Sequence, residues 1–246
     1  MSETVLEARK VNKKLGSGAG EVHAIKDIDL TLCGGELTML MGPSGSGKTT
    51  LLSVLGCMLT PTSGTVLICG KSIEGASKEA LAALRRQHIG FIFQSYHLFP
   101  TMTAAENVQL ALDVRGERGA QARKRAEEAL ARVGLAHKVS SYPTQLSGGE
   151  QQRVAIARAI VSDPSAILAD EPTAALDSNN GQAIMSILAS IAKDPSRGVL
   201  VVTHDSRLTS YADRIIFIED GRLVREERRR SKRDRPRAAA IRGRGS

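Results

Sequence analysis

The stretch that most constrains this chain is GPSGSGKTT, residues 42–50. It follows the apolar run ELTMLM (36–41) and opens a helical pattern, so G-x-x-x-x-G-K-[ST] lies in the strand–loop–helix context of a phosphate-binding loop. In such a loop, backbone N–H groups converge on phosphate oxygens, a lysine reaches the terminal phosphates, and a threonine hydroxyl can ligate Mg²⁺. The predicted phosphate-binding residues are Gly42, Pro43, Ser44, Gly45, Ser46, Gly47, Lys48, Thr49 and Thr50.

Near-continuous apolar runs elsewhere predict an α/β fold. Strands that are covered on both faces of a parallel sheet are apolar along their whole length. Helices are expected after Gly47, around 181–192 and around 205–212. The Asp220-Gly221 pair predicts a hairpin turn. The predicted strands are 36–41, 89–93, 165–170, 199–204 and 214–219.

Two further segments have a different character. TVLEARKVN (4–12) and EVHAIKDIDLTL (21–32) alternate between apolar and polar residues, which predicts an N-terminal antiparallel β subdomain. Residues 95–163 are charged, rich in alanine and without strand candidates, which predicts a helical subdomain inserted into the core. We therefore expect one P-loop nucleotide-hydrolase cassette over 1–227, with a parallel core sheet, and a separate tail over 228–246.

The net charge of +8 belongs to that tail. Residues 228–246 hold nine Lys or Arg and one Asp, while the 25 basic and 25 acidic residues before them cancel. The composition predicts a disordered, solubilising end, with contact to anionic lipid as an alternative. Nucleic acid is the least favoured partner. No apolar run approaches the roughly 20 residues that span a bilayer. The three cysteines lack metal-ligand spacing and are expected to be buried, reduced thiols.

A second chemical feature is the apolar run AILADE (166–171), which ends in two acids. At the tip of a strand in a P-loop protein, Asp170 can hold Mg²⁺ through its water shell, facing Thr49. Glu171 beside it can accept a proton from an attacking water. We predict that these two carboxylates and the phosphate loop form one site.

Taken together, these motifs resemble the nucleotide-binding subunit of an ABC transporter, in the family's order, over about residues 4 to 227. GPSGSGKTT matches the Walker A loop and AILADEP the Walker B strand. LSGGEQ (146–151) matches the ABC signature, which other P-loop classes lack. The Q-loop, D-loop and H-switch correspond to Gln94 in FIFQSYHLF, AALD (174–177) and His204 in VVTHD.

The resemblance implies ATP as substrate, Mg²⁺ as cofactor, and two copies that meet head to tail. Each signature, through Ser147, Gly148 and Gly149, would then cap the γ-phosphate held by the other copy. Asp177 would act across the same interface. The implied catalytic residues are Glu171, His204 and Gln94, and the implied metal-binding residues are Thr49, Gln94 and Asp170.

Two positions depart from the family pattern. Leu15 stands where an aromatic residue usually stacks on adenine, so stacking is lost there and base affinity and the preference for ATP over GTP are expected to weaken. Ala174 stands where serine is common, which removes one hydrogen bond without disabling the site.

The resemblance also implies a separate transmembrane permease, with this chain on the cytoplasmic face of the inner (plasma) membrane as a transport-coupled ATP hydrolase. The segment 95–108 is the candidate contact, through Tyr96, Leu98 and Phe99. Alternatively, these three side chains pack the helical subdomain. The amino-acid sequence around the motifs is most similar to that of the lipoprotein-release, macrolide-efflux and glycolipid-export branch. An amino-acid-type importer is the alternative. A non-transport ABC ATPase is less favoured, because the chain has neither a long coiled-coil insertion nor a second cassette.

Overall fold

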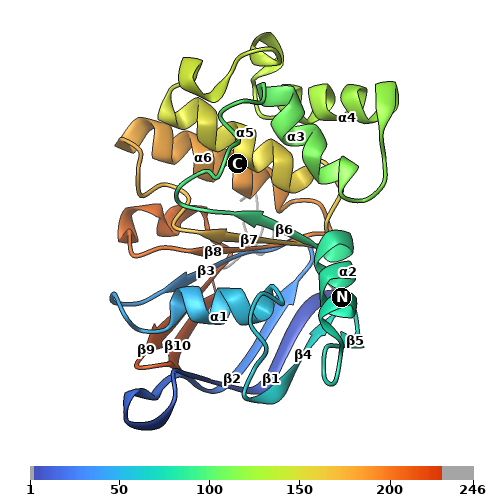
Figure 1. Cartoon of the computed structure of the whole chain (residues 1–246). Helices are drawn as coiled ribbons and strands as arrows, with labels where there is room; N and C mark the ends of the chain where they lie inside the picture. Colours follow the sequence, from blue (N-terminus) through green and yellow to red (C-terminus); the bar gives the residue numbers. More distant parts are fainter. Residues whose placement is uncertain (1–2, 229–246) are drawn as a thin grey trace, which may run out of the picture.

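Two β-sheets organise the protein, for which a computed structural model describes residues 3–228 (Figure 1). The smaller sheet is antiparallel and has the strand order β2-β1-β4-β5. The larger sheet has the order β10-β9-β3-β8-β7-β6. The strands of the smaller sheet are β1 (Thr4–Leu15), β2 (Val22–Cys33), β4 (Ser63–Ile68) and β5 (Lys71–Ser72), and those of the larger sheet are β3 (Leu37–Met41), β6 (Ile89–Ile92), β7 (Ala166–Asp170), β8 (Gly198–Val202), β9 (Arg214–Glu219) and β10 (Arg222–Arg228).

The larger sheet is parallel except at one edge. Strands β6, β7, β8, β3 and β9 pair in parallel, and β10 returns antiparallel to β9. All five apolar runs predicted as strands are present in it. Asp220 (φ 46°) and Gly221 (φ 78°) form the turn between β9 and β10, because a two-residue hairpin turn of this hand needs positive φ at both positions.

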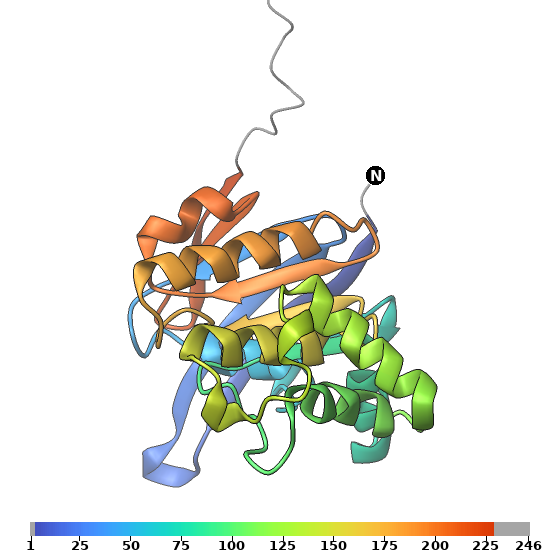
Figure 2. The ribbon, with the colours of Figure 1, turned by 90° about the horizontal axis from the view of Figure 1, so that it is seen from above.

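Helices cover both faces of the larger sheet. Its β7–β8 and β6–β7 connections place α3, α4, α5 and α6 on one side, and α1 lies on the other side, towards the smaller sheet (Figure 1). Between β6 and β7 the described elements are all helical, over the stretch predicted as a helical subdomain. Figure 2 shows α5 running beside α6, with α3 and α4 gathered at one side. The helices are α1 (Lys48–Leu55), α2 (Lys78–His88), α3 (Ala104–Asp113), α4 (Gly119–Arg132), α5 (Gly148–Ile160) and α6 (Ser178–Ile191), with 3₁₀ turns η1 (Gly18–Gly20), η2 (Ala136–Lys138), η3 (Pro143–Gln145) and η4 (Ser206–Tyr211).

Three details differ from the sequence-based expectation. The predicted helix around 205–212 is the short 3₁₀ helix η4, because Asp205 caps it at Arg207 and the chain is extended again at Ala212. Strand β4 and helix α2 were not predicted. Strand β10 ends at Arg228, the first residue assigned to the tail, and pairs there with Arg214. The rest of the predicted tail, 229–246, lies outside the described residues.

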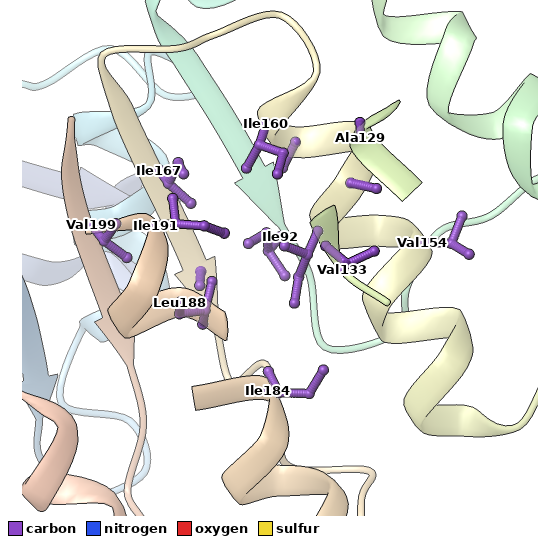
Figure 3. Close-up of a cluster of buried hydrophobic side chains, with 14 of the residues drawn as sticks. Ile92, Ala129, Val133, Val154, Ile160, Ile167, Ile184, Leu188, Ile191 and Val199 are labelled. Atoms are coloured by element: carbon purple, nitrogen blue, oxygen red, sulfur yellow. The ribbon is translucent and has the colours of Figure 1, made fainter. Parts of the chain in front are cut away.

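The strands of the larger sheet alternate between two buried clusters. Met39, Ile167 and Val199 face the helical side, whereas Leu40 and Val202 face α1 and the smaller sheet. Figure 3 shows part of the first cluster, with Leu188 and Ile191 of α6 on one side of Ile92 and Val154 of α5 on the other. Burial on both faces explains why the central strands are apolar at nearly every position. Of the described helices, none is both long and apolar enough to cross a membrane.

The cysteines are only partly as expected. The three thiols are free, and Cys57 is buried, whereas Cys33 and Cys69 are partly exposed. Burial raises the pKa of the Cys57 thiol to about 11.

Candidate nucleotide site

The predicted phosphate loop connects β3 to α1 and curls around the ammonium group of Lys48. Lys48 is 8% exposed, and its Nζ donates to the carbonyl oxygens of Gly42 (2.8 Å) and Pro43 (2.7 Å). Gly47 starts α1 with φ 101°, and a Cβ there would lie 2.5 Å from the Ala24 carbonyl oxygen. Only glycine meets both conditions without strain. The loop therefore presents its backbone, instead of side chains, at the start of a helix.

The hairpin between β9 and β10 is hydrogen-bonded to this loop. The Gly221 N–H donates to the Ser46 carbonyl oxygen (3.0 Å), and the Gly221 carbonyl accepts from the Lys26 N–H (2.8 Å). The Asp-Gly pair predicted the turn, but no sequence signal indicated that the turn contacts residues about 175 positions earlier. The phosphate loop is thus fixed to the last hairpin of the described chain.

Thr49 and Asp170 meet as predicted. Thr49 lies in the first turn of α1, and Asp170 ends β7, which is two strands away from β3. The Thr49 Oγ1 donates to the Asp170 Oδ1 over 3.2 Å. Burial raises the pKa of the Asp170 carboxyl, the bond from Thr49 opposes this rise, and the neighbouring Glu171 charge adds to it. Two hard oxygen ligands therefore lie together beside the phosphate loop.

Glu171 and His204 also lie in contact. His204 Nδ1 is 2.8 Å from Glu171 Oε1, and the Glu171 side chain is 16% exposed compared with 68% for His204. Glu171 has φ 45°, a left-handed conformation that a non-glycine residue adopts at a cost of about 1–3 kcal/mol. Its N–H donates to the Val202 carbonyl on β8, which holds this conformation. The carboxylate thereby contacts the histidine.

A cavity of about 930 Å³ joins these groups. Gln94, at the end of β6, lines it together with Glu171 and His204, and Leu15 and Val22 form its apolar flank. A second cavity, of about 420 Å³, shares Glu171, Ala174 and His204 with the first and continues to Asp177. The remaining residues that line the larger cavity are His23, Ala24, Lys26, Pro43, Ser44, Gly45, Gly47, Lys48, Thr49, Thr50, Ala174, Asp220 and Gly221.

The signature residues lie elsewhere. Among the described residues, Ser147, Gly148 and Gly149 line neither cavity. Ser147 caps α5, and its hydroxyl donates to the Glu150 carboxylate (2.9 Å), whose oxygen also accepts from the Ser147 N–H (2.8 Å). These bonds lower the pKa of Glu150. The S-x-x-E spacing of a capping box was the signal that sequence reasoning overlooked here.

The segment after Gln94 is strained and held by α5. Tyr96 (φ 58°) and His97 (φ 50°) are both left-handed. Arg158 of α5 donates to the carbonyl oxygens of Tyr96 (2.7 Å) and His97 (2.5 Å). Burial lowers the pKa of Arg158. This arginine was not predicted, because its partners are backbone atoms about 60 residues away.

The three apolar side chains of the predicted contact segment have different environments. Leu98 packs against the helical-side cluster, and Tyr96 is half-buried. Phe99 is 48% exposed, while its N–H and carbonyl group are both bonded to the buried Asn107. The position of Leu98 is explained by packing within the helical subdomain. Packing does not explain Phe99, because its ring is exposed.

A glycine-rich loop between a parallel strand and a helix, with a half-buried acid at the tip of a nearby strand, defines a P-loop nucleotide-binding protein. Within that class, the family model of the ABC transporter matches residues 25–174. The chain belongs to the ABC transporter family and is an ATP-binding, ATP-hydrolysing cassette of it.

Curated relatives and solved structures agree with this assignment. The macrolide export ATP-binding/permease protein MacB of Salmonella choleraesuis (strain SC-B67) is 46% identical over 220 residues, which are 89% of this chain. MacB of Escherichia coli (strain K12) is 44% identical over 221 residues, 90% of this chain. In both cases the match covers 34% of the relative, so the chain spans about a third of the length of the curated relatives it matches.

Two solved structures superpose closely. The ATP-binding cassette MJ0796, in a dimeric post-hydrolysis state bound to ADP and Pi, gives a TM-score of 0.83 at 42% identity, covering 92% of this chain and 99% of that chain. CbiO1 from Clostridium perfringens, part of the ABC transporter complex cbiONQ, gives a TM-score of 0.82 at 30% identity, covering 92% of this chain and 89% of that chain.

Proposed function

We propose that this cassette works as a head-to-tail pair and that its Mg²⁺-dependent ATP hydrolysis powers a transmembrane permease of the export type. The observation that carries the proposal is the separation of the signature from the phosphate loop. Both are phosphate-binding devices at helix starts, yet Ser147, Gly148 and Gly149 do not line the cavity of their own chain. A second copy, turned head to tail, would bring each signature over the other copy's phosphate loop.

The site has the groups that ATP and Mg²⁺ need. The Ser46 hydroxyl is buried in the loop without a hydrogen-bond partner among the described residues, and phosphate oxygens would satisfy it. Lys48 would exchange its two carbonyl contacts for the terminal phosphates. Thr49, Asp170 and Gln94 would hold Mg²⁺, which characteristically takes few protein ligands and keeps waters and phosphate oxygens. When bound, the ion would neutralise charge on those phosphates.

Proton transfer in this site is assigned to Glu171. Its carboxylate would accept the proton of the attacking water, because it lies at the cavity wall beside the phosphate loop. His204, 2.8 Å away, would orient that carboxylate and bond the γ-phosphate. Ser147 would turn its hydroxyl from Glu150 to a phosphate oxygen, and Asp177 would act across the interface.

The export assignment rests on MacB, whose name includes both an ATP-binding and a permease part. We place the chain at the cytoplasmic face of the inner membrane, with segment 95–108 against the permease. Phe99 is the side chain best exposed for that contact. Contact between the basic tail and anionic lipid stays a prediction, since residues 229–246 lie outside the described chain.

The test is complementation between two inactive variants. Ser147→Arg places bulk and charge where the γ-phosphate is capped, and Lys48→Ala removes the ammonium of the phosphate loop. Each homodimer then lacks an intact site. A mixed dimer retains one, formed by the normal phosphate loop of one copy and the normal signature of the other.

The measurement is ATP retained on purified mixed dimers, which are selected through two different affinity tags. About one nucleotide per mixed dimer is expected, and close to none in either parent. If mixed dimers retain no more than the parents, each signature serves its own chain and the head-to-tail proposal is wrong.

A further inference from the structure

The two signature glycines are not required by the backbone conformation. Gly148 and Gly149 occupy the first turn of α5, and neither has a positive φ. Glycine in a helix costs about 1 kcal/mol relative to alanine. The backbone conformation alone therefore does not account for glycine here, and the space around each position is the next condition.

Side chains from the segment after β6 and from the start of α6 approach these glycines closely. A Cβ at position 149 would lie 2.7 Å from Asn180 Oδ1 and 3.0 Å from its Cγ. A Cβ at position 148 would lie 3.0 Å from the Tyr96 hydroxyl oxygen and 3.5 Å from Leu176 Cδ2. Gly149 is buried under the Asn180 side chain, which is itself half-buried.

Asn180 is fixed at its other end to Asp177. Its Nδ2 donates to Asp177 Oδ2 (2.6 Å), and its backbone N–H donates to Asp177 Oδ1 (2.9 Å). Asp177 caps α6, and these bonds hold the pKa of its carboxyl low. The Asn180 amide thus lies between Asp177 and Gly149, which belong to different helices.

We propose that Asn180 is a positioning residue, which holds the first turn of α5 (Gly148 and Gly149) in a fixed position relative to the D-loop (174–177) of the same chain. Both segments would then approach the partner's nucleotide together. This inference rests on the proposed head-to-tail pair. If Asn180 is altered, the relative position of these two segments is no longer fixed, and the nucleotide bound by the other copy is retained less well.

The test uses a mixed dimer with a single working site and introduces the same substitution in one copy or in the other. All chains carry Glu171→Gln, so that ATP is retained. One copy also carries Lys48→Ala, and the only working site then combines its signature with the partner's phosphate loop. Asn180→Asp keeps the shape of the amide but sets a second carboxylate against Asp177. It is introduced either in the copy that donates the working signature or in the other copy.

We expect about tenfold weaker ATP retention when the change is in the signature-donating copy, which corresponds to the loss of one hydrogen bond to a charged group. Retention should change less than about twofold when it is in the other copy. Equal losses on both sides, or no loss on either, would overturn the proposal, because a general weakening of the fold does not depend on the side. Asn180→Ala should give the same asymmetry without the added charge.

Asn179→Asp is the matched control. It makes the same chemical change one residue earlier, at an exposed side chain that forms no hydrogen bond in the described part of the chain. It should leave retention unchanged on both sides. The mixed dimer of Ser147→Arg and Lys48→Ala tests the head-to-tail arrangement separately. If that dimer retains ATP and the Asn180 asymmetry is absent, only the role of Asn180 is wrong.

Discussion

Thr49 Oγ1 lies 3.2 Å from Asp170 Oδ1, although the two residues are 121 positions apart in the chain. The contact holds a carboxylate where burial raises its pKa, so the ionised form is disfavoured in the folded chain. A half-buried carboxylate beside the phosphate loop is consistent with the proposed Mg²⁺ site, and we expect it to lower the stability of the nucleotide-free fold.

The first prediction follows from that pKa. Because the folded-state pKa of Asp170 is raised, its contribution to stability is complete below the unfolded-state pKa of about 3.9 and is lost as pH rises through the folded-state value. At pH 7, Asp170→Asn should therefore raise the melting temperature of the nucleotide-free protein, by about 2–4 °C for each kcal/mol recovered. Thermal unfolding between pH 4 and 8 measures this effect, which should shrink towards pH 4.

The same variant should lose the stabilisation that Mg²⁺ and ATP add to the natural protein. Glu74→Gln, the same change at an exposed carboxyl group, serves as the control and should alter neither quantity. A lower melting temperature for Asp170→Asn at pH 7 would show that the carboxylate stabilises the nucleotide-free fold.

The second prediction concerns Glu171 as the catalytic base. Glu171→Gln keeps the shape of the side chain but removes the proton acceptor, so the ATPase turnover should fall about 10²–10⁴-fold. ATP affinity should be retained, since the phosphate loop is untouched. Steady-state turnover and equilibrium ATP binding distinguish the two effects. Turnover within threefold of the natural rate would place the base at another residue, and Glu219→Gln controls for the loss of a carboxylate.

The third prediction concerns Leu15. It lines the larger cavity at the end of β1 and is 37% exposed, so a ring there would reach the same wall. An aromatic contact adds about 0.5–1.5 kcal/mol, and Leu15→Tyr should tighten ATP binding about 2- to 10-fold. Titration calorimetry on the Glu171→Gln background measures it. Leu15→Met, which has a similar volume, should not change the ATP affinity. Equal ATP affinities for the Leu15→Tyr and Leu15→Met variants would show that the adenine ring binds elsewhere.

The fourth prediction concerns Arg158. Arg158→Ala removes both bonds to the Tyr96 and His97 carbonyl groups, and each left-handed residue stores about 1–3 kcal/mol of strain. Residues 94–99 should then exchange their amide hydrogens at least about tenfold faster, as measured by mass spectrometry. Arg153→Ala, on the same helix, should leave this segment unchanged. Unchanged exchange in Arg158→Ala would mean that Asn107 and the packing of Leu98 hold the segment without the arginine.

Sequence reasoning succeeded where the signal is local. The phosphate loop and the apolar strands follow from consecutive residues, and Thr49 and Asp170 meet because the tips of parallel strands share one edge of the sheet. It failed where a residue acts through distant backbone atoms. Arg158, which bonds two carbonyl groups, carries no local pattern, and the Asp-Gly pattern at Gly221 predicts a turn but not its bond to Ser46. Strand β4, which pairs with β1, was also missed.

The position of β3 has a consequence for synthesis. Its two neighbours in the sheet are β8 and β9, paired at Leu40 with Val202 and at Met41 with Phe217. A ribosome therefore releases the phosphate loop long before either neighbouring strand exists, and the β9–β10 hairpin that bonds Ser46 is also made after it. A nascent chain that stops after β7 has both Walker sequences but lacks the strand between them. We therefore expect nucleotide binding to require every strand up to the β9–β10 hairpin, although the phosphate loop is made much earlier.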